Sequence, residues 1–122
     1  PAPPSWQQQT PGMMQDAKFA VGGGKAVVTV SEAGGAMVPN IQRWRGQLQM
    51  AQASDAEVEK AATPLDLKGV KATLVDLAGP TQRMIVIIVP KGDLSVFYKL
   101  MGESAAVAAE KDALIEFARK VK

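Results

Sequence analysis

The chain has 122 residues, of which 47% are hydrophobic and 21% are charged, a composition typical of one soluble globular domain. Its 14 basic and 12 acidic residues are interspersed and give a net charge of +2, so they create no large field that would attract a polyanion. The longest apolar run, MIVIIV at residues 84–89, is far shorter than the roughly 20 residues that cross a bilayer. We expect neither a nucleic-acid partner nor a direct membrane span.

The sequence contains no cysteine and no histidine. Their absence excludes a Ser-His-Asp triad, a cysteine nucleophile, a c-type haem attachment and a zinc site built from these residues. Carboxylates, lysines and Tyr98 remain as acid–base groups, but no spacing couples them into a catalytic motif. The six methionines form no MxxM cluster that would favour copper, and we assign Met37 and Met84 to the core. We therefore expect no catalytic residue, no cofactor and no metal, in a protein that is not an enzyme.

The chain begins PAPPSW, and its prolines predict an extended N-terminal arm over residues 1–12 that leads to Trp6. A single α+β domain is expected over residues 13–122. A chain that begins with Pro1 rather than Met resembles a protein from which a signal peptide has been removed, although a boundary chosen for expression gives the same beginning. We expect an exported protein, on the periplasmic or extracellular face.

Residues 14–31 predict a β-hairpin. In KAVVTVSE, Ala26, Val28 and Val30 fall on one face and Val27 and Thr29 on the other, as a half-buried strand requires. MMQDAKFAV would be its partner, and the glycines of GGGK supply the backbone freedom for the reversal.

A helix is predicted next, because Met37, Ile41, Trp44 and Leu48 recur at steps of four, three and four and form one apolar stripe. This periodicity places the Trp44 side chain in the core. Pro39 fits the first turn, and Gly46 is interpreted as a site of close packing. Arg43 and Arg45 lie about 200° apart around the helix axis, so they cannot form one cationic cluster, and we expect Arg45 to be an exposed charge.

Asn40, Arg43 and Gln47 form a polar row along one edge of this stripe. Two interpretations stay open for the row. Its members satisfy backbone groups where the helix meets a sheet, which is the commoner role, or they hold an anionic or carbonyl group of a partner. These three residues are the candidate partner-binding site.

Ser54 followed by Glu57 matches a capping box and predicts a short second helix before Pro64. Strand patterns lie on both sides of Gly69, and QRMIVIIVPKGDLSVFYKLMG predicts a second hairpin that turns at residues 90–93. Because residues 84–89 are all apolar, that strand should be covered on both faces and lie centrally. Residues 103–121 predict a C-terminal helix with Val107, Leu114, Ala118 and Val121 on one face.

This order of elements predicts the α+β class, with an antiparallel β-sheet packed against helices. NIQRWRGQ, TLVDLAGP, VFYKLMG and AAVAAEKDALIEFARKV together resemble a set of uncharacterised bacterial exported proteins over most of the chain. The order of elements also looks like the Mog1/PsbP-like fold, a sandwich whose members include extrinsic subunits of photosynthetic complexes and a nuclear-transport factor. No functional motif of these members falls on particular residues here.

Two functions are expected from these observations. The first, implied by the resemblance, is an exported, non-catalytic accessory or binding module that docks onto a protein partner, such as a photosynthetic or respiratory membrane complex. The second is a small-molecule carrier whose apolar pocket, between sheet and helices, is edged by Arg43, Gln47 or Tyr98. A pocket in the structure distinguishes the two.

Overall fold

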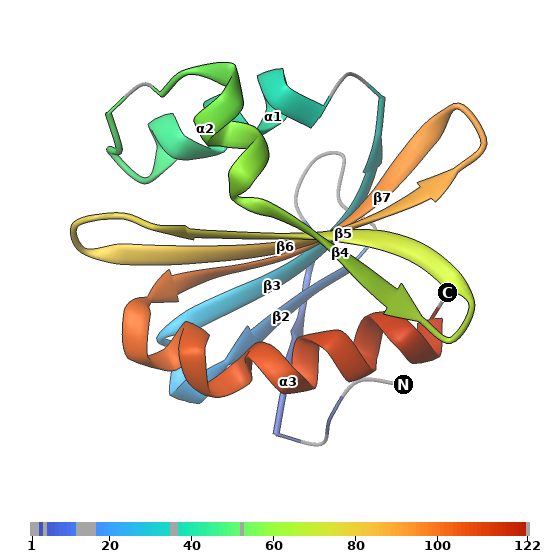
Figure 1. Ribbon diagram of the computed structural model, residues 1–122. Helices are drawn as coiled ribbons and strands as arrows, with labels where there is room; N and C mark the ends of the chain where they lie inside the picture. Colours follow the sequence, from blue (N-terminus) through green and yellow to red (C-terminus); the bar gives the residue numbers. More distant parts are fainter. Residues whose placement is uncertain (1–2, 4, 12–16, 35–36, 52, 122) are drawn as a thin grey trace.

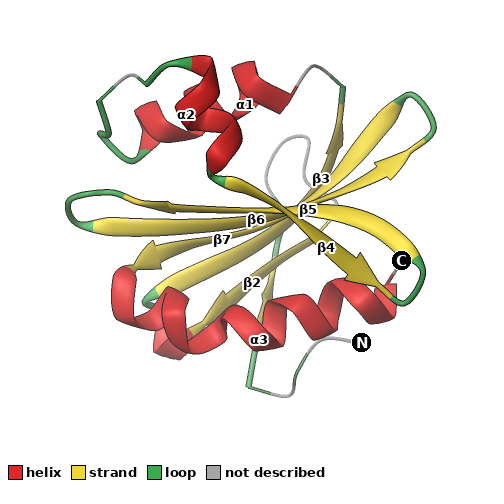
Figure 2. Ribbon diagram, in the orientation of Figure 1, coloured by secondary structure: helices red, strands yellow, loops and turns green. Residues whose placement is uncertain are grey.

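One antiparallel sheet carries helices on both of its faces (Figures 1 and 2). The computed structural model describes residues 3, 5–11, 17–34, 37–51 and 53–121, and in these residues the sheet has seven strands in the order β1-β2-β3-β7-β6-β5-β4. Helices α1 and α2 lie on one face and α3 lies on the other (Figure 1). The predicted α+β class is confirmed.

The elements follow the predicted order, with one additional strand at the beginning. Their bounds are β1 (Gln7–Gln9), β2 (Ala17–Val21), a 3-10 turn η1 (Gly22–Gly24), β3 (Ala26–Ala33), α1 (Met37–Gln47), α2 (Asp55–Lys60), β4 (Ala62–Leu67), β5 (Val70–Ala78), β6 (Gln82–Lys91), β7 (Leu94–Glu103) and α3 (Ser104–Val121). The edges of the sheet are β1, which has only three residues, and β4, in which Pro64 stands opposite Thr73.

Strand β6 is buried on both faces from Met84 to Val89, as its apolar run predicts. Met84, Val86 and Ile88 belong to the core under α1 and α2, and the alternate residues Ile85, Ile87 and Val89 belong to the core under α3. Strands β5 and β7 flank β6, and β7 is the middle strand of the seven. The continuous apolar sequence therefore serves two separate cores.

Both predicted hairpins are present. Strands β2 and β3 pair from Ala17 to Val30, whereas residues 14–16 of the predicted hairpin lie outside the described residues. The turn between them places Gly22, Gly23 and Gly24 at positive φ, where side chains are disfavoured. The β6–β7 turn is tighter than expected, because Pro90 and Lys91 still pair with Ser95 and Leu94.

Helix α1 buries Ile41 and Trp44, and Leu48 follows it into the same core. The assignment of Met37 to the core was wrong: at the first residue of the helix it exposes 37% of its surface. Met84 is fully buried as expected. The Trp44 ring meets Phe97 of β7 edge to face, with ring centroids 5.5 Å apart, and this contact fixes α1 on the sheet.

Two interpretations at the end of α1 were also wrong. Gly46 is exposed, and nothing lies within 4 Å of the position of a Cβ there, so it permits no close packing. Arg45 is only partly exposed, and its Nη2 donates a hydrogen bond of 2.9 Å to the Ala51 carbonyl. Arg45 therefore holds the segment that follows the helix. The predicted N-cap is confirmed: the Glu57 amide donates to Ser54 Oγ at 3.2 Å.

The N-terminal arm is extended over residues 7–9, but it joins the sheet as β1 beside β2. Trp6 anchors it: the indole packs against Phe19 and Phe117, at centroid distances of 5.6 and 5.2 Å. Its Nε1 donates a hydrogen bond of 2.6 Å to the Glu110 carboxylate of α3. The arm is thus tied to the α3 core by one buried ring.

Truncation of Trp44 tests the helical assignment. Trp44→Ala removes a ring that is 97% buried and leaves a cavity against Phe97, so we expect a loss of about 3–5 kcal/mol in the free energy of unfolding. Urea denaturation followed by circular dichroism measures this loss. A variant as stable as the wild type would contradict the packing of α1 on the sheet.

Two glycine substitutions should change stability in opposite directions. A Cβ on Gly102 would lie 2.4 Å from the Lys25 carbonyl oxygen and 2.5 Å from Ala26 Cα, so Gly102→Ala should destabilise the protein by about 1–3 kcal/mol or more. Gly46→Ala meets open space in an exposed helix and should stabilise it by about 1 kcal/mol. Thermal unfolding of the two variants measures both changes. Equal shifts in Tm would contradict the close contact of Gly102 in β7 with Lys25 and Ala26.

Candidate functional site

A cavity of about 520 Å³ opens on the α3 face of the sheet, at the end where β6 turns into β7. Strands β2, β3, β5, β6 and β7 contribute its walls, and α3 closes one side with Phe117. The lining residues are Ala17, Val30, Glu32, Val70, Val89, Pro90, Lys91, Val96, Tyr98 and Phe117. This volume falls within the range of small-molecule sites, and most of the lining side chains are apolar.

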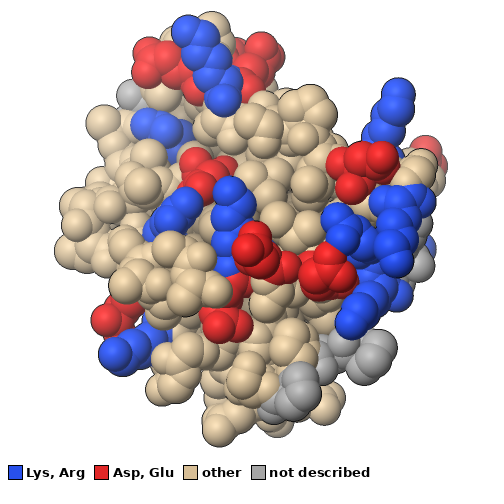
Figure 3. Space-filling model, turned by 60° about the horizontal axis from the view of Figure 1, so that its bottom comes forward, with Lys and Arg blue, Asp and Glu red and all other residues tan. Residues whose placement is uncertain are grey.

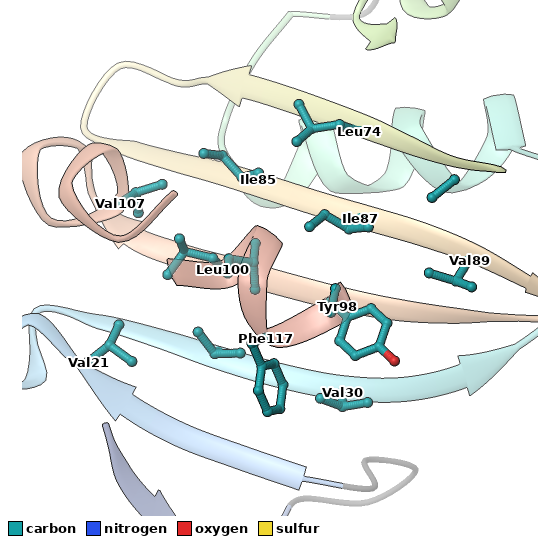
Figure 4. Close-up of a cluster of buried hydrophobic side chains, with 14 of the residues drawn as sticks. Val21, Val30, Leu74, Ile85, Ile87, Val89, Tyr98, Leu100, Val107 and Phe117 are labelled. Atoms are coloured by element: carbon teal, nitrogen blue, oxygen red, sulfur yellow. The ribbon is translucent and has the colours of Figure 1, made fainter. Parts of the chain in front are cut away.

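The strand period explains how these residues meet. Val30 and Glu32 on β3 are two residues apart, as are Val96 and Tyr98 on β7, so each pair faces the same side. Strand pairing then aligns them, since Val30 stands opposite Tyr98 and Glu32 opposite Val96. Val30, Val89, Tyr98 and Phe117 lie together at one end of the core (Figure 4).

Tyr98 is the buried polar residue of the cavity, with 3% of its surface exposed. Its ring packs edge to face against Phe117 at a centroid distance of 6.0 Å, and its hydroxyl points away from the packed side chains (Figure 4). Among the described residues, none forms a hydrogen bond with this hydroxyl. Burial raises the pKa of the phenol above its ordinary value, although the nearby charge of Lys91 lowers it to a smaller extent. The hydroxyl is therefore neutral at pH 7 and can serve a ligand as hydrogen-bond donor or acceptor.

An ion pair stands at the rim of the cavity. Lys91 Nζ lies 2.5 Å from Glu32 Oε1, and both residues line the cavity. The Lys91 side chain is largely exposed, so solvent screening leaves the pair little effect on stability, less than about 1 kcal/mol. Its position instead gives the rim both a positive and a negative charge beside an apolar interior.

Of the residues that the sequence associated with a pocket, only Tyr98 lines this cavity. Arg43 and Gln47 are exposed on α1, which packs on the opposite face of the sheet. Asn40 is buried, whereas Arg43 and Gln47 are exposed. The three side chains of the predicted polar row therefore do not share one environment. Its role as a partner-binding site stays a prediction.

A second, smaller hollow of about 280 Å³ lies on the α1 face and was not recognised from the sequence. It is lined by Val27, Thr29, Gln82, Lys99 and Met101. Burial lowers the pKa of the Lys99 ammonium, and the positive charge of Arg43 lowers it further. The hollow could have been found only by aligning β3 with β7, which places Thr29 opposite Lys99.

Two charged side chains and one phenol line the cavity on the α3 face. Its single phenol is held neutral, and its one carboxylate is paired with Lys91.

Within the described ranges, no group of three or more acidic residues is placed to hold a metal ion. None of the helices in the described part of the chain has the length and apolar character to cross a bilayer. Basic and acidic side chains lie next to one another on the face that carries α3 (Figure 3).

Titration of the single tyrosine of the chain tests the environment of the cavity. Because burial raises the pKa of Tyr98, the absorbance of tyrosinate near 295 nm should appear at a higher pH in the folded protein than in the urea-unfolded chain, which should titrate near 10. The folded state holds the proton longer, so this group's contribution to stability should be lost as the pH rises above about 10. A folded-state midpoint equal to the unfolded one would contradict the buried phenol.

No protein-family model matches the chain, and no curated protein matches it. Its structure is similar to the crystal structure, at 1.50 Å resolution, of a protein from Bacteroides thetaiotaomicron VPI-5482. The two share 11% sequence identity at a TM-score of 0.56, and the match covers 93% of this chain and 41% of the other. The chain therefore spans less than half of that protein's length, and the likeness concerns the fold alone: this α+β architecture also occurs in a bacterial protein.

Proposed function

We propose that the protein is a non-catalytic binding module that carries a small, largely apolar ligand in the cavity between the sheet and α3. The observation that carries the proposal is the cavity of about 520 Å³, which has an apolar lining and an unpartnered phenol among the described residues. Sites for small molecules commonly combine such a lining with a few polar groups that orient the ligand. This favours the carrier, the second of the two functions expected from the sequence.

The ligand best suited to the cavity has an apolar body and one polar end. The apolar body would contact Val30, Val89 and Val96, and a hydroxyl or carbonyl group would meet the Tyr98 hydroxyl. The Glu32–Lys91 pair at the rim would tolerate a polar end that reaches the solvent. Burial of apolar area would supply most of the affinity, at about 25 cal/mol per Å² before the costs of association.

An accessory role in a larger assembly is the second candidate. The resemblance to exported bacterial proteins and to the Mog1/PsbP-like fold supports this accessory role. The same resemblance supports a site of action outside the cytoplasm. The exposed Arg43 and Gln47 on α1 offer polar contacts to a protein partner. This role is compatible with ligand carriage, because α1 and the cavity lie on opposite faces of the sheet.

A cavity-filling substitution tests the carrier. We expect the neutral apolar dye N-phenyl-1-naphthylamine to bind saturably to the wild type with increased fluorescence, and Val96→Phe to weaken binding by about tenfold or more, because the added ring occupies the cavity. Val27→Phe is the matched control, since Val27 is also partly buried but faces the smaller hollow. Equal binding by both variants, or loss only in Val27→Phe, would contradict the proposed site.

A further inference from the structure

We propose that the α1 face of the sheet holds a phosphate-binding site formed by Lys18, Lys99 and Arg43, with the Thr29 hydroxyl between the two lysines. This site is separate from the carrier cavity and does not depend on it. Its geometry follows from strand register and from the hollow beside Lys99.

Register places the two lysines on one face. Lys18 of β2 stands opposite Thr29 of β3, and Thr29 stands opposite Lys99 of β7. Residues directly opposite one another in a sheet project from the same face. The backbones of β2 and β7 are two strand spacings apart, or about 10 Å, a gap that two lysine side chains can span to one group above Thr29.

Helix α1 brings the third cation to this face. Trp44 contacts Phe97, which lies two residues before Lys99 and so faces the same side of the sheet. Arg43, the neighbour of Trp44, is close enough for its charge to lower the pKa of Lys99, in addition to the larger effect of burial. Lys99 lines a hollow of about 280 Å³ with Thr29 and Gln82, so a small anion has space beside it.

The described part of the chain places no counter-charge on these cations. Among the described residues, no carboxylate forms an ion pair with Lys18, Arg43 or Lys99. Helix α1 contains no acidic residue, and Glu103, the acidic residue of β7 on this face, is four residues from Lys99, or about 13 Å along the strand. Like charges that share a partly buried site disfavour one another unless an anion joins them.

The number and arrangement of the cations favour phosphate over a carboxylate. A phosphate group carries roughly −1.5 to −2 charges at pH 7 and presents acceptor oxygens in several directions. It can therefore meet an ammonium from each side and a guanidinium from the helix at once. A carboxylate has one negative charge and two coplanar oxygens, so it would leave at least one of the three cations without a partner.

An NMR titration at constant ionic strength tests the site, with chloride replaced by inorganic phosphate. We expect saturable shifts of the amides of Lys18, Thr29 and Lys99, and a loss of affinity of about tenfold or more in Lys99→Met and in Arg43→Gln. Lys111→Met removes the same charge from α3, on the other face, and should bind as the wild type does. Phosphoserine is titrated in parallel: tighter binding than phosphate supports an esterified phosphate, and equal or weaker binding supports the free ion.

Thermal unfolding supplies a readout that a structural role for Lys99 would not give. Without phosphate, Lys99→Met should raise the Tm, because it removes a partly buried charge that Arg43 opposes. Phosphate should raise the Tm of the wild type and of Lys111→Met, but not that of Lys99→Met. Absence of saturable phosphate and phosphoserine binding, or unchanged binding in both Lys99→Met and Arg43→Gln, would overturn the proposal.

Discussion

The burial of β6 on both faces is the constraint on which the rest of the molecule depends. Its apolar residues alternate between two cores. Burial of these residues stabilises the fold fully only if helices cover both faces of the sheet. Helix α3 supplies one cover, and α1 with α2 supplies the other. If either cover were lost, half of the strand would be exposed to water. The two layers of helix are therefore needed together, although they are far apart in sequence.

The same alternation separates the cavity on the α3 face from the smaller hollow on the α1 face. Tyr98 and Lys99 are neighbours in β7, yet Tyr98 lines the apolar cavity and Lys99 lines the smaller hollow with Thr29 and Met101. A strand that crosses the middle of the sheet can serve two chemically different surfaces because successive side chains point in opposite directions. Their separation also requires a fixed register, since a slip of one residue would exchange the two faces.

The sequence alone predicted the elements that a local pattern of residues determines. The continuous run in β6, the N-cap at Ser54 and the glycines at residues 22–24 each carry a local signal that the structure follows. Strand β1 has no such signal, because QQQ shows no apolar alternation, and its pairing depends on Trp6 contacts with residues far away in sequence.

Positions that depend on tertiary contacts were less predictable. Helical spacing placed Met37 on the buried stripe, but spacing does not show which side chains of the first turn the sheet covers: Met37 is exposed, whereas Asn40 is buried. Tyr98 was expected beside Arg43 and Gln47 because a single sequence does not assign residues of separate elements to one face of a sheet. The small hollow required the pairing of β3 with β7, which no local pattern encodes.

The two outer strands also determine how copies of the domain can meet. Pro64 in β4 has no backbone N–H, and β1 offers only three residues, so neither outer strand is a good template for another strand. Such edges oppose the open-ended, strand-to-strand stacking that leads to aggregation. A chain with a highly apolar central strand, which would aggregate readily if it were exposed, is thereby protected at the places where another sheet would attach.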